Sequence, residues 1–185
     1  MKYEIEINNE VKTVEVKDKQ VILLLQGCPA SGKSTFAEKL VQASKECDSF
    51  CGINRFKFDI VCRDDIRASK GIRQTDFSRE NEVTDEEMSK ARESLDLGYS
   101  LIVADTNLNP KYFHIWEELA DEYDAELQKL LLYIPYWEAV KRDKARDRHV
   151  GHRAIERFYR QYFPNRLRDE LTDKRPINES YNAMR

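Results

Sequence analysis

The feature that most constrains this chain is an eight-residue pattern. Residues 27–34 read Gly-Cys-Pro-Ala-Ser-Gly-Lys-Ser, which is G-x-x-x-x-G-K-S. The pattern follows an apolar run at Val21–Leu25 and precedes a helix-like stretch from Thr35. Its glycines permit a tight loop whose backbone N–H groups surround phosphates, and the N-terminal end of the next helix adds positive charge. A chance match in such a chain is on the order of 1%. We therefore expect a strand, a phosphate loop and a helix here, rather than a simple glycine-rich turn.

The loop residues have predicted roles in holding ATP, or another nucleoside triphosphate, with Mg²⁺. The amine of Lys33 has the reach to contact the β- and γ-phosphates, and the hydroxyl of Ser34 is a Mg²⁺ ligand. The predicted nucleotide-binding residues of the loop are Gly27, Cys28, Pro29, Ala30, Ser31, Gly32, Lys33, Ser34 and Thr35.

Size and composition limit the class of protein. The chain has 185 residues, which favours a single domain over residues 1–185, and its net charge is −3. That charge argues against a protein that coats long nucleic acid by charge alone, although a local basic groove remains compatible with it. No signal peptide or membrane-spanning run is recognisable, so we expect a cytoplasmic protein with no membrane partner. Four cysteines, Cys28, Cys47, Cys51 and Cys62, lack zinc-site spacing and favour free thiols over a metal or disulfide role.

Strand and helix patterns alternate along the chain. Residues 3–16 alternate around Asn8-Asn9 and predict a β-hairpin within an N-terminal extension of residues 1–19. The expected strands are 21–26, 56–62, 100–104 and 126–134. The first expected helix ends near Ala43, and the second starts at a capping box of Thr84 and Glu87 and ends before Gly98. Three further helices are expected at 110–123, at 136–145 and in a segment that ends near Tyr162. A polar stretch at 68–83 and a polar tail at 170–185 are expected to be irregular. This order predicts an α/β fold, a parallel sheet with helices on both faces.

Polar residues follow the second and third strands of this sheet, where ligands of such folds bind. Asp64 and Asp65 are candidates for orienting and deprotonating an acceptor hydroxyl. Helix capping is the other interpretation, and beside a phosphate loop we assign one of the two to catalysis. Arg67, one turn beyond Asp64, is positioned to hold an acceptor phosphate or to form a surface ion pair of little energy.

The segment after the third strand offers a second set of polar groups. Asp105 is placed to hold Mg²⁺ through water, and Thr106, Asn107 and Asn109 offer neutral hydrogen bonds. Ordinary turn chemistry before a helix explains the same residues equally well.

A basic segment near residues 141–160 is the last candidate. It contains Lys141, Arg142, Lys144, Arg146, Arg148, Arg153, Arg157 and Arg160. One interpretation is a solvated helix face, and the other is a lid at 146–153 whose arginines stabilise transition-state charge. His149 and His152 lie in this segment without a third metal ligand, so a solvated or phosphate-facing role is favoured over a metal site.

Taken together, these segments resemble the phage polynucleotide 5′-kinase family over about residues 20–165. The matching pieces are the phosphate loop at 27–35, Arg-Asp-Asp-Ile-Arg at 63–67, Asp-Thr-Asn-Leu-Asn-Pro at 105–110, and Pro-Tyr-Trp-Glu-Ala-Val-Lys-Arg at 135–142 with Arg146. Their order and approximate spacing fit the family, and the second and third pieces make the match sharper than the phosphate loop alone.

The resemblance implies a role for each matching residue. Lys33 and Ser34 bind the donor triphosphate and Mg²⁺, and Asp64 is the general base for the 5′-hydroxyl of RNA or DNA. Arg67 grips the acceptor 3′-phosphate, and Arg146, with Arg142, contacts the donor phosphates. The resemblance places Asp105, Thr106 and Asn107 on the acceptor side.

The resemblance also sets expectations about partners. Family members carry a C-terminal phosphatase domain that this sequence does not show, so we expect no 3′-phosphatase activity unless a separate phosphatase or ligase partner supplies it. A phage origin implies the cytoplasm of the host cell. The N-terminal extension and the histidines of the basic segment have no counterpart that we can map, and self-association stays open.

Three hypotheses therefore compete. The first is an ATP-dependent polynucleotide 5′-kinase acting in nucleic-acid repair. The second is a phosphate-loop kinase of a small metabolite or nucleotide sugar, which would ignore an oligonucleotide acceptor. The third is a nucleotide-binding switch without transfer chemistry, which the presence of a base, a lid arginine and a phosphate loop counts against.

Overall fold

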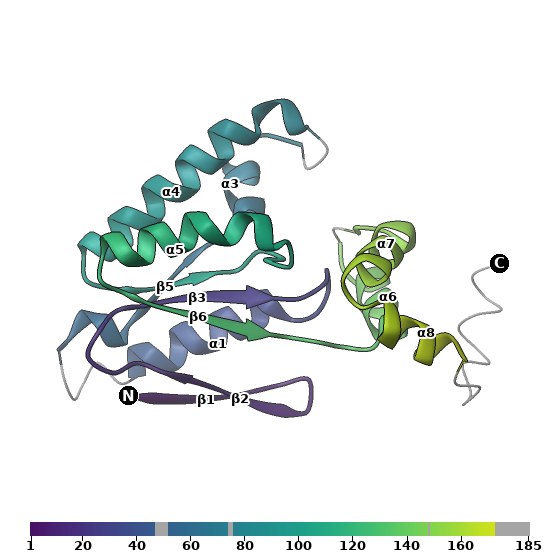
Figure 1. Cartoon of the computed structure of the whole chain (residues 1–185), viewed down its shortest axis with the longest axis horizontal. Helices are drawn as coiled ribbons and strands as arrows, with labels where there is room; N and C mark the ends of the chain where they lie inside the picture. The colour runs from purple at the N-terminus through teal and green to yellow at the C-terminus, as the bar shows by residue number, and fades with distance from the viewer. Residues whose placement is uncertain (47–51, 74–75, 148, 173–185) are drawn as a thin grey trace. The chain divides into compact units, whose positions relative to one another are not determined.

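The structure is a computed structural model that describes residues 1–46, 52–73, 76–147 and 149–172 (Figure 1). The chain divides into two compact units. The first comprises residues 1–27 and 31–132, and the second comprises residues 28–30 together with the chain from Tyr133 onward. Each unit is described by itself below.

A four-stranded parallel sheet forms the centre of the first unit. Its strands are β3 (Val21–Gln26), β4 (Phe58–Val61), β5 (Ser100–Val103) and β6 (Glu126–Leu131). They lie in the order β4-β5-β3-β6, and every neighbouring pair is parallel. The helical connections between strands are what such a sheet requires, because parallel neighbours cannot be joined by tight hairpins. The α/β class expected from the sequence is confirmed.

Helices cover both faces of this sheet. They are α1 (Lys33–Glu46), α3 (Arg63–Ser69), α4 (Glu80–Asp96) and α5 (Phe113–Glu122), with short 3₁₀ turns η1 (Asn54–Phe56), η2 (Phe77–Arg79) and η3 (Pro110–Tyr112). In Figure 1, α1 lies on one side of the sheet, and α3, α4 and α5 lie on the other.

Alternate residues of β3 separate two hydrophobic clusters. Leu23 and Leu25 point to the cluster shared with α1, whereas Ile22 and Leu24 point to the cluster shared with α3, α4 and α5. All four side chains are essentially inaccessible to solvent. A strand buried on both faces reads as a continuous apolar run, and this explains why Val21–Leu25 shows no alternation.

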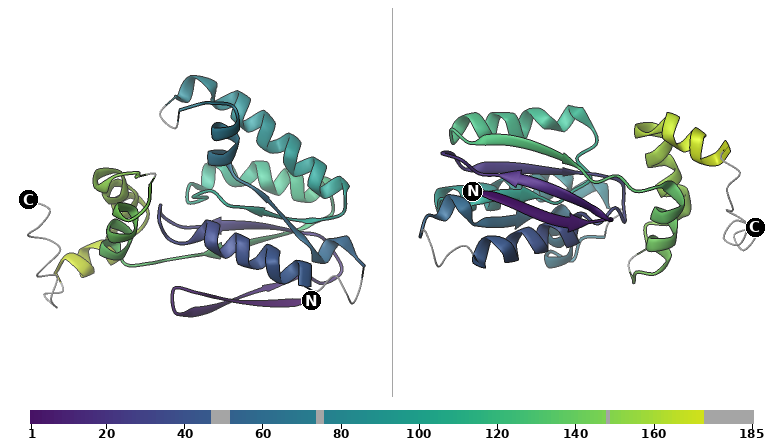
Figure 2. Two further views of the ribbon diagram at one scale, coloured as in Figure 1. Left: turned by 180° about the vertical axis from the view of Figure 1, so that it is seen from behind. Right: turned by 90° about the horizontal axis from the view of Figure 1, so that it is seen from below.

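An antiparallel hairpin covers α1 and the same face of the sheet, as Figure 2 shows from two further directions. It consists of β1 (Lys2–Ile7) and β2 (Glu10–Glu15), which pair from Lys2 opposite Glu15 to Ile7 opposite Glu10. The two turn residues, Asn8 and Asn9, have φ values of 54° and 60°. Asparagine tolerates this left-handed conformation, which is the one that two-residue hairpins favour. The predicted hairpin is therefore confirmed, and its register is now defined.

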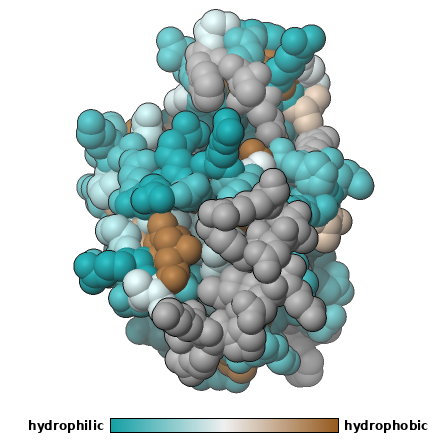
Figure 3. Space-filling view, turned by 90° about the vertical axis from the view of Figure 1, so that its right-hand side faces the viewer, coloured by the Kyte–Doolittle hydropathy of each residue, from teal (hydrophilic) through white to brown (hydrophobic). Residues whose placement is uncertain are grey.

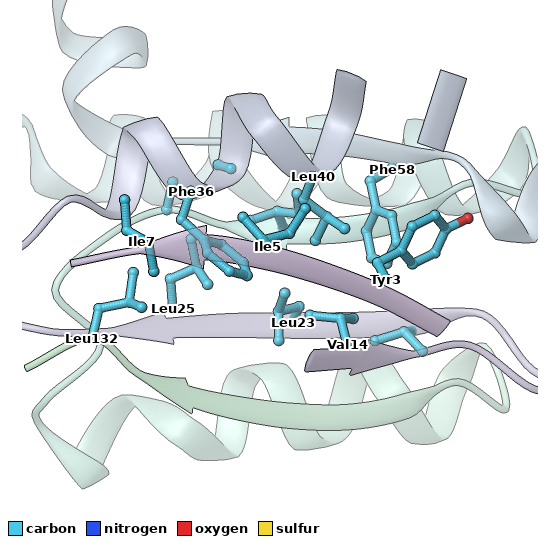
Figure 4. Packing of buried hydrophobic residues seen from close by; sticks show 14 of the residues in the cluster. Tyr3, Ile5, Ile7, Val14, Leu23, Leu25, Phe36, Leu40, Phe58 and Leu132 are labelled. Carbon is cyan, nitrogen blue, oxygen red and sulfur yellow. The ribbon is translucent and has the colours of Figure 1, made fainter. Parts of the chain in front are cut away.

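The hairpin contributes side chains to the core. Tyr3, Ile5 and Ile7 of β1 lie against Phe36 and Leu40 of α1 in the close-up of Figure 4. The ring of Tyr3 also meets Phe58 edge-on, with ring centroids 5.8 Å apart. The extension is thus an integral layer of the first unit.

Several predicted boundaries were wrong for identifiable reasons. Strand β6 ends at Leu131 instead of residue 134, because its partner β3 ends at Gln26 opposite it. Strand β4 starts at Phe58 because residues 54–56 form a 3₁₀ turn, in which the Lys57 N–H donates to the Asn54 carbonyl. Helix α1 continues to Glu46, past the expected end near Ala43.

The predicted capping box at Thr84 was also wrong. Helix α4 already begins at Glu80, so the polar stretch expected at 68–83 is partly helical. The Thr84 hydroxyl donates to the Glu80 carbonyl within the helix, and the Glu87 carboxylate accepts from Arg63. The predicted stop at Gly98 is confirmed, since Gly98 has a φ of 84° and donates its N–H to the Leu95 carbonyl.

The second unit contains three helices in its described part. These are α6 (Tyr136–Lys144), α7 (His152–Tyr162) and α8 (Pro164–Thr172). Tyr136 and Tyr159 meet edge-on with ring centroids 5.3 Å apart, and the Tyr159 hydroxyl donates to the Ile134 carbonyl. Hydrophilic residues dominate the coloured surface in the space-filling view of Figure 3.

Helix α8 was missed by the sequence reasoning, which treated residues 170–185 as a loose polar tail. Glu170 lies within α8, and its carboxylate accepts hydrogen bonds from the Tyr133 hydroxyl and the Tyr136 N–H. Leu167 of α8 is buried. The rest of the predicted tail, residues 173–185, lies outside the described residues.

Two further expectations concern the membrane and the cysteines. None of the helices in the described part of the chain has the length and apolar character needed to cross a membrane. Cys28 and Cys62 form no disulfide, whereas Cys47 and Cys51 lie outside the described residues.

Candidate active site

The phosphate loop connects β3 to α1, as the sequence predicted. Its lysine is folded back on the loop, because Lys33 Nζ donates to the Gly27 carbonyl at 2.9 Å. Lys33 is buried, whereas Ser34 and Thr35 are exposed in the first turn of α1. The α1 N-terminus therefore presents hydroxyl groups at the positive end of the helix dipole, which is the arrangement that binds a phosphate and its cation.

Gly27 is a position where no side chain fits. A Cβ there would lie 2.4 Å from Ser31 Oγ and 2.6 Å from the Leu132 carbonyl oxygen. Its backbone N–H donates to the Thr106 carbonyl at 3.0 Å, which ties the loop to the segment after β5. The glycine is thus required by the close approach of three chain segments.

Asn107 holds two strand ends together. Its Nδ2 donates to the carbonyls of Leu25 and Val103 at 3.1 and 3.0 Å, and its backbone carbonyl accepts from Gln26 Nε2. Its φ of 43° places it in the left-handed region that asparagine tolerates. The amide donors of Asn107 are therefore used to fix β3 against β5. This favours the turn-type interpretation of the residue over direct contact with an acceptor.

Asp64 and Arg67 lie on α3, directly after β4. The Asp64 carboxylate is 61% exposed, and its Oδ1 is 3.9 Å from Arg67 Nη1. Arg67 itself is largely buried and forms an ion pair with Glu80 at the start of α4. The structure thus brings the proposed base and the proposed phosphate-binding arginine together, and it shows that the arginine already has a carboxylate partner.

Arg63 connects α3 to α4 in a network that sequence reasoning missed. Its Nη1 donates to Glu87 at 2.5 Å, and its Nη2 donates to Glu80 at 2.7 Å and to Thr84 at 3.1 Å. Although burial opposes ionisation of Glu80, the bonds from Arg67 and Arg63 hold its pKa below the ordinary value. Residues 80, 84 and 87 share one face of α4, and Arg63 and Arg67 are four residues apart on α3. These matching helical spacings are a sequence signal that could have predicted the network.

Asp105 is the most perturbed carboxyl group of the site. Its Oδ1 accepts from the Arg63 N–H at 3.1 Å. Its Oδ2 is buried and receives no hydrogen bond from a donor group among the residues that the structure describes. Burial and the charge of the Glu87 carboxylate raise the pKa of Asp105 well above its ordinary value. Burial and the charge of Asp105 likewise raise the pKa of the neighbouring Cys62 thiol to about 11.

Oxygen groups suited to Mg²⁺ occur in the first unit. The Ser34 hydroxyl is exposed, and the Asp105 Oδ2 is a buried oxygen that receives no hydrogen bond from a described donor. Hydroxyl and carboxylate oxygens, completed by phosphates and waters, are the ligands that this ion prefers. The described residues contain no group of three or more His, Cys, Asp and Glu side chains arranged to hold a metal by themselves.

The basic segment belongs to the second unit, where Arg142, Arg146 and Arg160 are paired with acidic neighbours. Arg142 Nε donates to Glu138 at 2.7 Å, and Arg146 Nη2 lies 2.8 Å from Asp143. Asp143 is 2% exposed and accepts from the N–H groups of Val150 and Gly151 at 3.0 and 2.8 Å. This carboxylate therefore organises the loop before α7, a role that its sequence position among basic residues did not indicate.

The two histidines of this segment also have local partners. His149 Nδ1 lies 2.7 Å from the Asp143 carbonyl, and His152 Nε2 bonds the Tyr136 hydroxyl. Arg148 lies outside the described residues. The side chains of Arg153 and Arg157 are exposed on α7.

Comparison with known families now becomes informative. A family model described as an AAA domain, AAA_33, matches residues 22–164, which is more than half of the chain. The chain belongs to this AAA domain family. The match contains the phosphate loop and every residue placed above in the candidate site.

Solved structures share the fold of this AAA domain. A Pnkp1/Rnl/Hen1 RNA repair complex matches with a TM-score of 0.58 and 19% identity, covering 84% of this chain and 46% of that chain. Another Pnkp1/Rnl/Hen1 complex has a TM-score of 0.55 and 23% identity, with coverages of 69% and 40%. The APS kinase CysC of Mycobacterium tuberculosis, in complex with AMPPNP and APS, has a TM-score of 0.50 and 13% identity, with coverages of 69% and 70%.

These likenesses establish a phosphate-loop kinase-like fold for the AAA domain. The chain spans less than half the length of the Pnkp1/Rnl/Hen1 chains that it matches. Because proteins of this fold act on different acceptors, the acceptor must be argued from the site itself.

Proposed function

We propose that this AAA domain is a polynucleotide 5′-kinase that transfers the γ-phosphate of ATP to the 5′-hydroxyl end of RNA or DNA. The observation that carries the proposal is the pairing on α3 of an exposed carboxylate, Asp64, with a largely buried arginine, Arg67. This helix follows β4, and the phosphate loop follows β3 in the same parallel sheet. Since parallel strands end at one edge, a donor phosphate and an acceptor hydroxyl have binding groups on the same side.

In this proposal Asp64 acts as the general base. It accepts the proton of the 5′-hydroxyl as that oxygen forms a bond to the γ-phosphorus. The bond from the γ-phosphorus to the bridging oxygen of ATP breaks, and ADP leaves with those electrons. The exposure of Asp64 supports this role, because a general base must come within hydrogen-bond reach of its substrate.

The phosphate loop holds the donor. The Gly32, Lys33 and Ser34 N–H groups surround the β-phosphate, and Lys33 exchanges its bond with the Gly27 carbonyl for phosphate oxygens. Ser34, with Asp105 through water, would hold Mg²⁺. When bound, this ion would supply positive charge that offsets the negative charge developing on the transferred phosphoryl group.

Arg146, with Arg142, is proposed to contact the donor phosphates. Arg142 now pairs with Glu138 on α6, and Arg146, just beyond the end of α6, pairs with Asp143. Both arginine side chains are partly exposed, so a triphosphate can compete with these carboxylates for the guanidinium groups. An arginine that stabilises the transferring phosphoryl group contributes roughly 10³–10⁵ in rate.

The acceptor side rests on Arg67. We propose that Arg67 binds the 3′-phosphate of the terminal nucleotide, and that this phosphate competes with Glu80 for the guanidinium. Arg67 Nε supports this role, because it is buried and has no hydrogen-bond partner among the described residues. The RNA repair named for one structural neighbour supports a repair role, in which a separate phosphatase or ligase completes the pathway. A cytoplasmic location, that of the host if the chain is phage-encoded, belongs to the same proposal.

A transfer assay tests the proposal. The assay uses γ-labelled ATP, Mg²⁺ and a short 5′-hydroxyl oligonucleotide, with Asp64→Ala and a matched control, Asp65→Ala, which removes the exposed carboxylate next in the chain. We expect wild type and the control to label the oligonucleotide, and Asp64→Ala to lose about 10²–10⁴ in rate while still binding ATP. Full activity of Asp64→Ala would remove its assignment as the base.

A small-metabolite or nucleotide-sugar kinase is the alternative, and the Arg67–Glu80 ion pair favours it. An arginine neutralised by Glu80 is less attractive to a phosphate than a free one. Under this alternative the oligonucleotide stays unlabelled although ATP binds, and Arg67→Ala leaves transfer to a small hydroxyl acceptor unchanged. Under the main proposal, Arg67→Ala weakens acceptor binding and the rate depends on oligonucleotide length.

A further inference from the structure

The turn of the N-terminal hairpin lies directly on the phosphate loop. Asn8 Nδ2 donates a hydrogen bond to the Ser31 carbonyl at 3.0 Å. A Cβ on Gly32 would lie 3.4 Å from Ile7 Cδ1 and 3.6 Å from Asn8 Oδ1. Ile7, the last residue of β1, and Asn8, the first residue after it, therefore lie beside Ser31 and Gly32 of the loop.

The bond to Ser31 fixes one particular peptide plane. The Ser31 carbonyl and the Gly32 N–H belong to the same planar trans peptide, so they point in opposite directions. When Asn8 holds the carbonyl toward the hairpin, the Gly32 N–H must point away from it. Gly32 has a φ of 95°. Glycine adopts positive and negative φ values about equally readily, so its own backbone does not select this conformation. An external bond is therefore an effective way to select this orientation.

The hairpin is anchored firmly enough to act as a support. Ile7 is buried and lies near Phe36 at the N-terminal end of α1 in Figure 4. Lys39 Nζ of α1 donates to the Glu6 carbonyl of β1 at 2.8 Å. The helix that begins with the phosphate-loop lysine and the strand that ends at Ile7 are thus attached to each other beside the loop.

We propose that Asn8 is a positioning residue for the triphosphate donor. It holds the Ser31–Gly32 peptide so that the Gly32 N–H is directed at a donor phosphate before ATP binds. The N-terminal hairpin thereby serves as a structural support of the phosphate loop. This inference rests on the proposed function only in that the loop binds a nucleoside triphosphate, and it is independent of the acceptor.

The test measures the equilibrium Kd for ATP with Mg²⁺, without acceptor. Asn8→Asp keeps the shape and the left-handed tolerance but replaces the Nδ2 donor by an oxygen facing a carbonyl oxygen. Asn8→Gly removes the side chain without straining the backbone. Asn9→Asp, at the exposed neighbouring turn position, is the matched control for the added charge. We expect both Asn8 variants to raise the Kd roughly 3- to 10-fold, as loss of one hydrogen bond predicts, and Asn9→Asp to change it less than twofold.

A second control separates loop positioning from general loosening of the hairpin. Tyr3→Phe removes the bond from the Tyr3 hydroxyl to the Phe56 carbonyl, at the other end of β1. Thermal unfolding should show a lower melting temperature for Tyr3→Phe than for wild type, whereas its Kd for ATP should be unchanged. Unchanged ATP binding in both Asn8 variants would overturn the inference, and so would an equal loss in Asn9→Asp or Tyr3→Phe.

If wild type bound no ATP, that result would count against the proposed function. A second, ligand-free measurement would still test the role of Asn8. Amide NMR of the nucleotide-free protein should show a shifted Gly32 N–H resonance and faster hydrogen exchange in Asn8→Asp and Asn8→Gly. The same resonance should be unchanged in Asn9→Asp. A Gly32 amide that is insensitive to Asn8 would overturn the inference regardless of ligand.

Discussion

Two aspartates, one in each unit, have pKa values shifted in opposite directions. Asp105 of the first unit has its pKa raised well above the ordinary value by burial and by the Glu87 carboxylate. Asp143 of the second unit has its pKa lowered, although burial opposes ionisation there too, because the Val150 and Gly151 N–H groups and Arg146 stabilise its charge. Burial alone therefore does not decide the charge of a carboxyl group.

The difference lies in the neighbours that each fold region supplies. Among the described residues, the Asp143 carboxylate accepts hydrogen bonds from the Arg146 side chain and from the Val150 and Gly151 N–H groups, which closes the loop before α7 around it. Asp105 accepts from the Arg63 N–H, but burial and the nearby Glu87 carboxylate oppose its ionisation. The first arrangement stabilises a carboxylate, whereas the second favours a protonated carboxyl group.

The largest expected effect comes from removing the better-paired carboxylate. Asp143→Ala leaves the Val150 and Gly151 N–H groups and the Arg146 guanidinium without their acceptor. We expect a loss of about 2–4 kcal/mol in the free energy of unfolding, measured by urea denaturation at neutral pH. Asp147→Ala, at an exposed position in the same loop, is the control and should change stability by less than about 0.5 kcal/mol. Equal losses in both variants would show that Asp143 does not organise the loop.

A smaller effect should follow from neutralising the neighbour of Asp105. Glu87→Gln keeps an acceptor for Arg63 but removes the negative charge, which should cost about 1 kcal/mol as a charged hydrogen bond becomes neutral. The pKa of Asp105 should fall toward its ordinary value, because the charge of Glu87 is one cause of its elevation. Carboxyl NMR titration measures this directly. A pKa that stays as high as in wild type would assign the elevation to burial alone.

The smallest effect at neutral pH is expected for Asp105→Asn. The amide can still accept from the Arg63 N–H and can donate to Glu87, so the free energy of unfolding at pH 7 should change by no more than about 1 kcal/mol, in the stabilising direction.

The pH dependence of Asp105→Asn should differ more clearly. In wild type the folded state holds the Asp105 proton more tightly than the unfolded state does. Stability linked to Asp105 is therefore complete below the ordinary carboxyl pKa and is lost as pH rises through the raised value. The free energy of unfolding of the variant should lack this decline, as measured by urea denaturation at a series of pH values. Asp143 acts oppositely, because its contribution is present above the ordinary carboxyl pKa and is lost as pH falls through its lowered value. If the free energy of unfolding of Asp105→Asn depended on pH as steeply as that of wild type, the raised pKa would not belong to Asp105.

Much of the fold was readable from the sequence because local signals agreed. The phosphate-loop pattern, the apolar run before it and the Asn-Asn turn each predicted an element that the structure contains. The segments at 63–67 and 105–107 were correctly expected at strand ends. Their roles in catalysis and binding remain predictions, as does the single-domain assignment.

Other features could not be read locally. The Thr84–Glu87 pair fits a capping box in isolation, and its use in the Arg63 network depends on α3 packing against α4. Strand ends were misjudged because a strand stops where its partner's hydrogen bonds stop, and the partner is distant in sequence. Helix α8 was missed because the partners of its Glu170 carboxylate, Tyr133 and Tyr136, lie more than 30 residues earlier in the chain.

The sequence by itself determined the hairpin, the four strands of the parallel sheet, the phosphate loop and the α/β class, because these follow from backbone preferences and hydrophobic period within short windows. The tertiary structure alone decided the raised pKa of Asp105, the pairing of Arg67 with Glu80 and the contact of Asn8 with Ser31. Each of these depends on groups that are brought together only by packing, and electrostatic and hydrogen-bond energies act over a few ångströms in space, irrespective of separation along the chain.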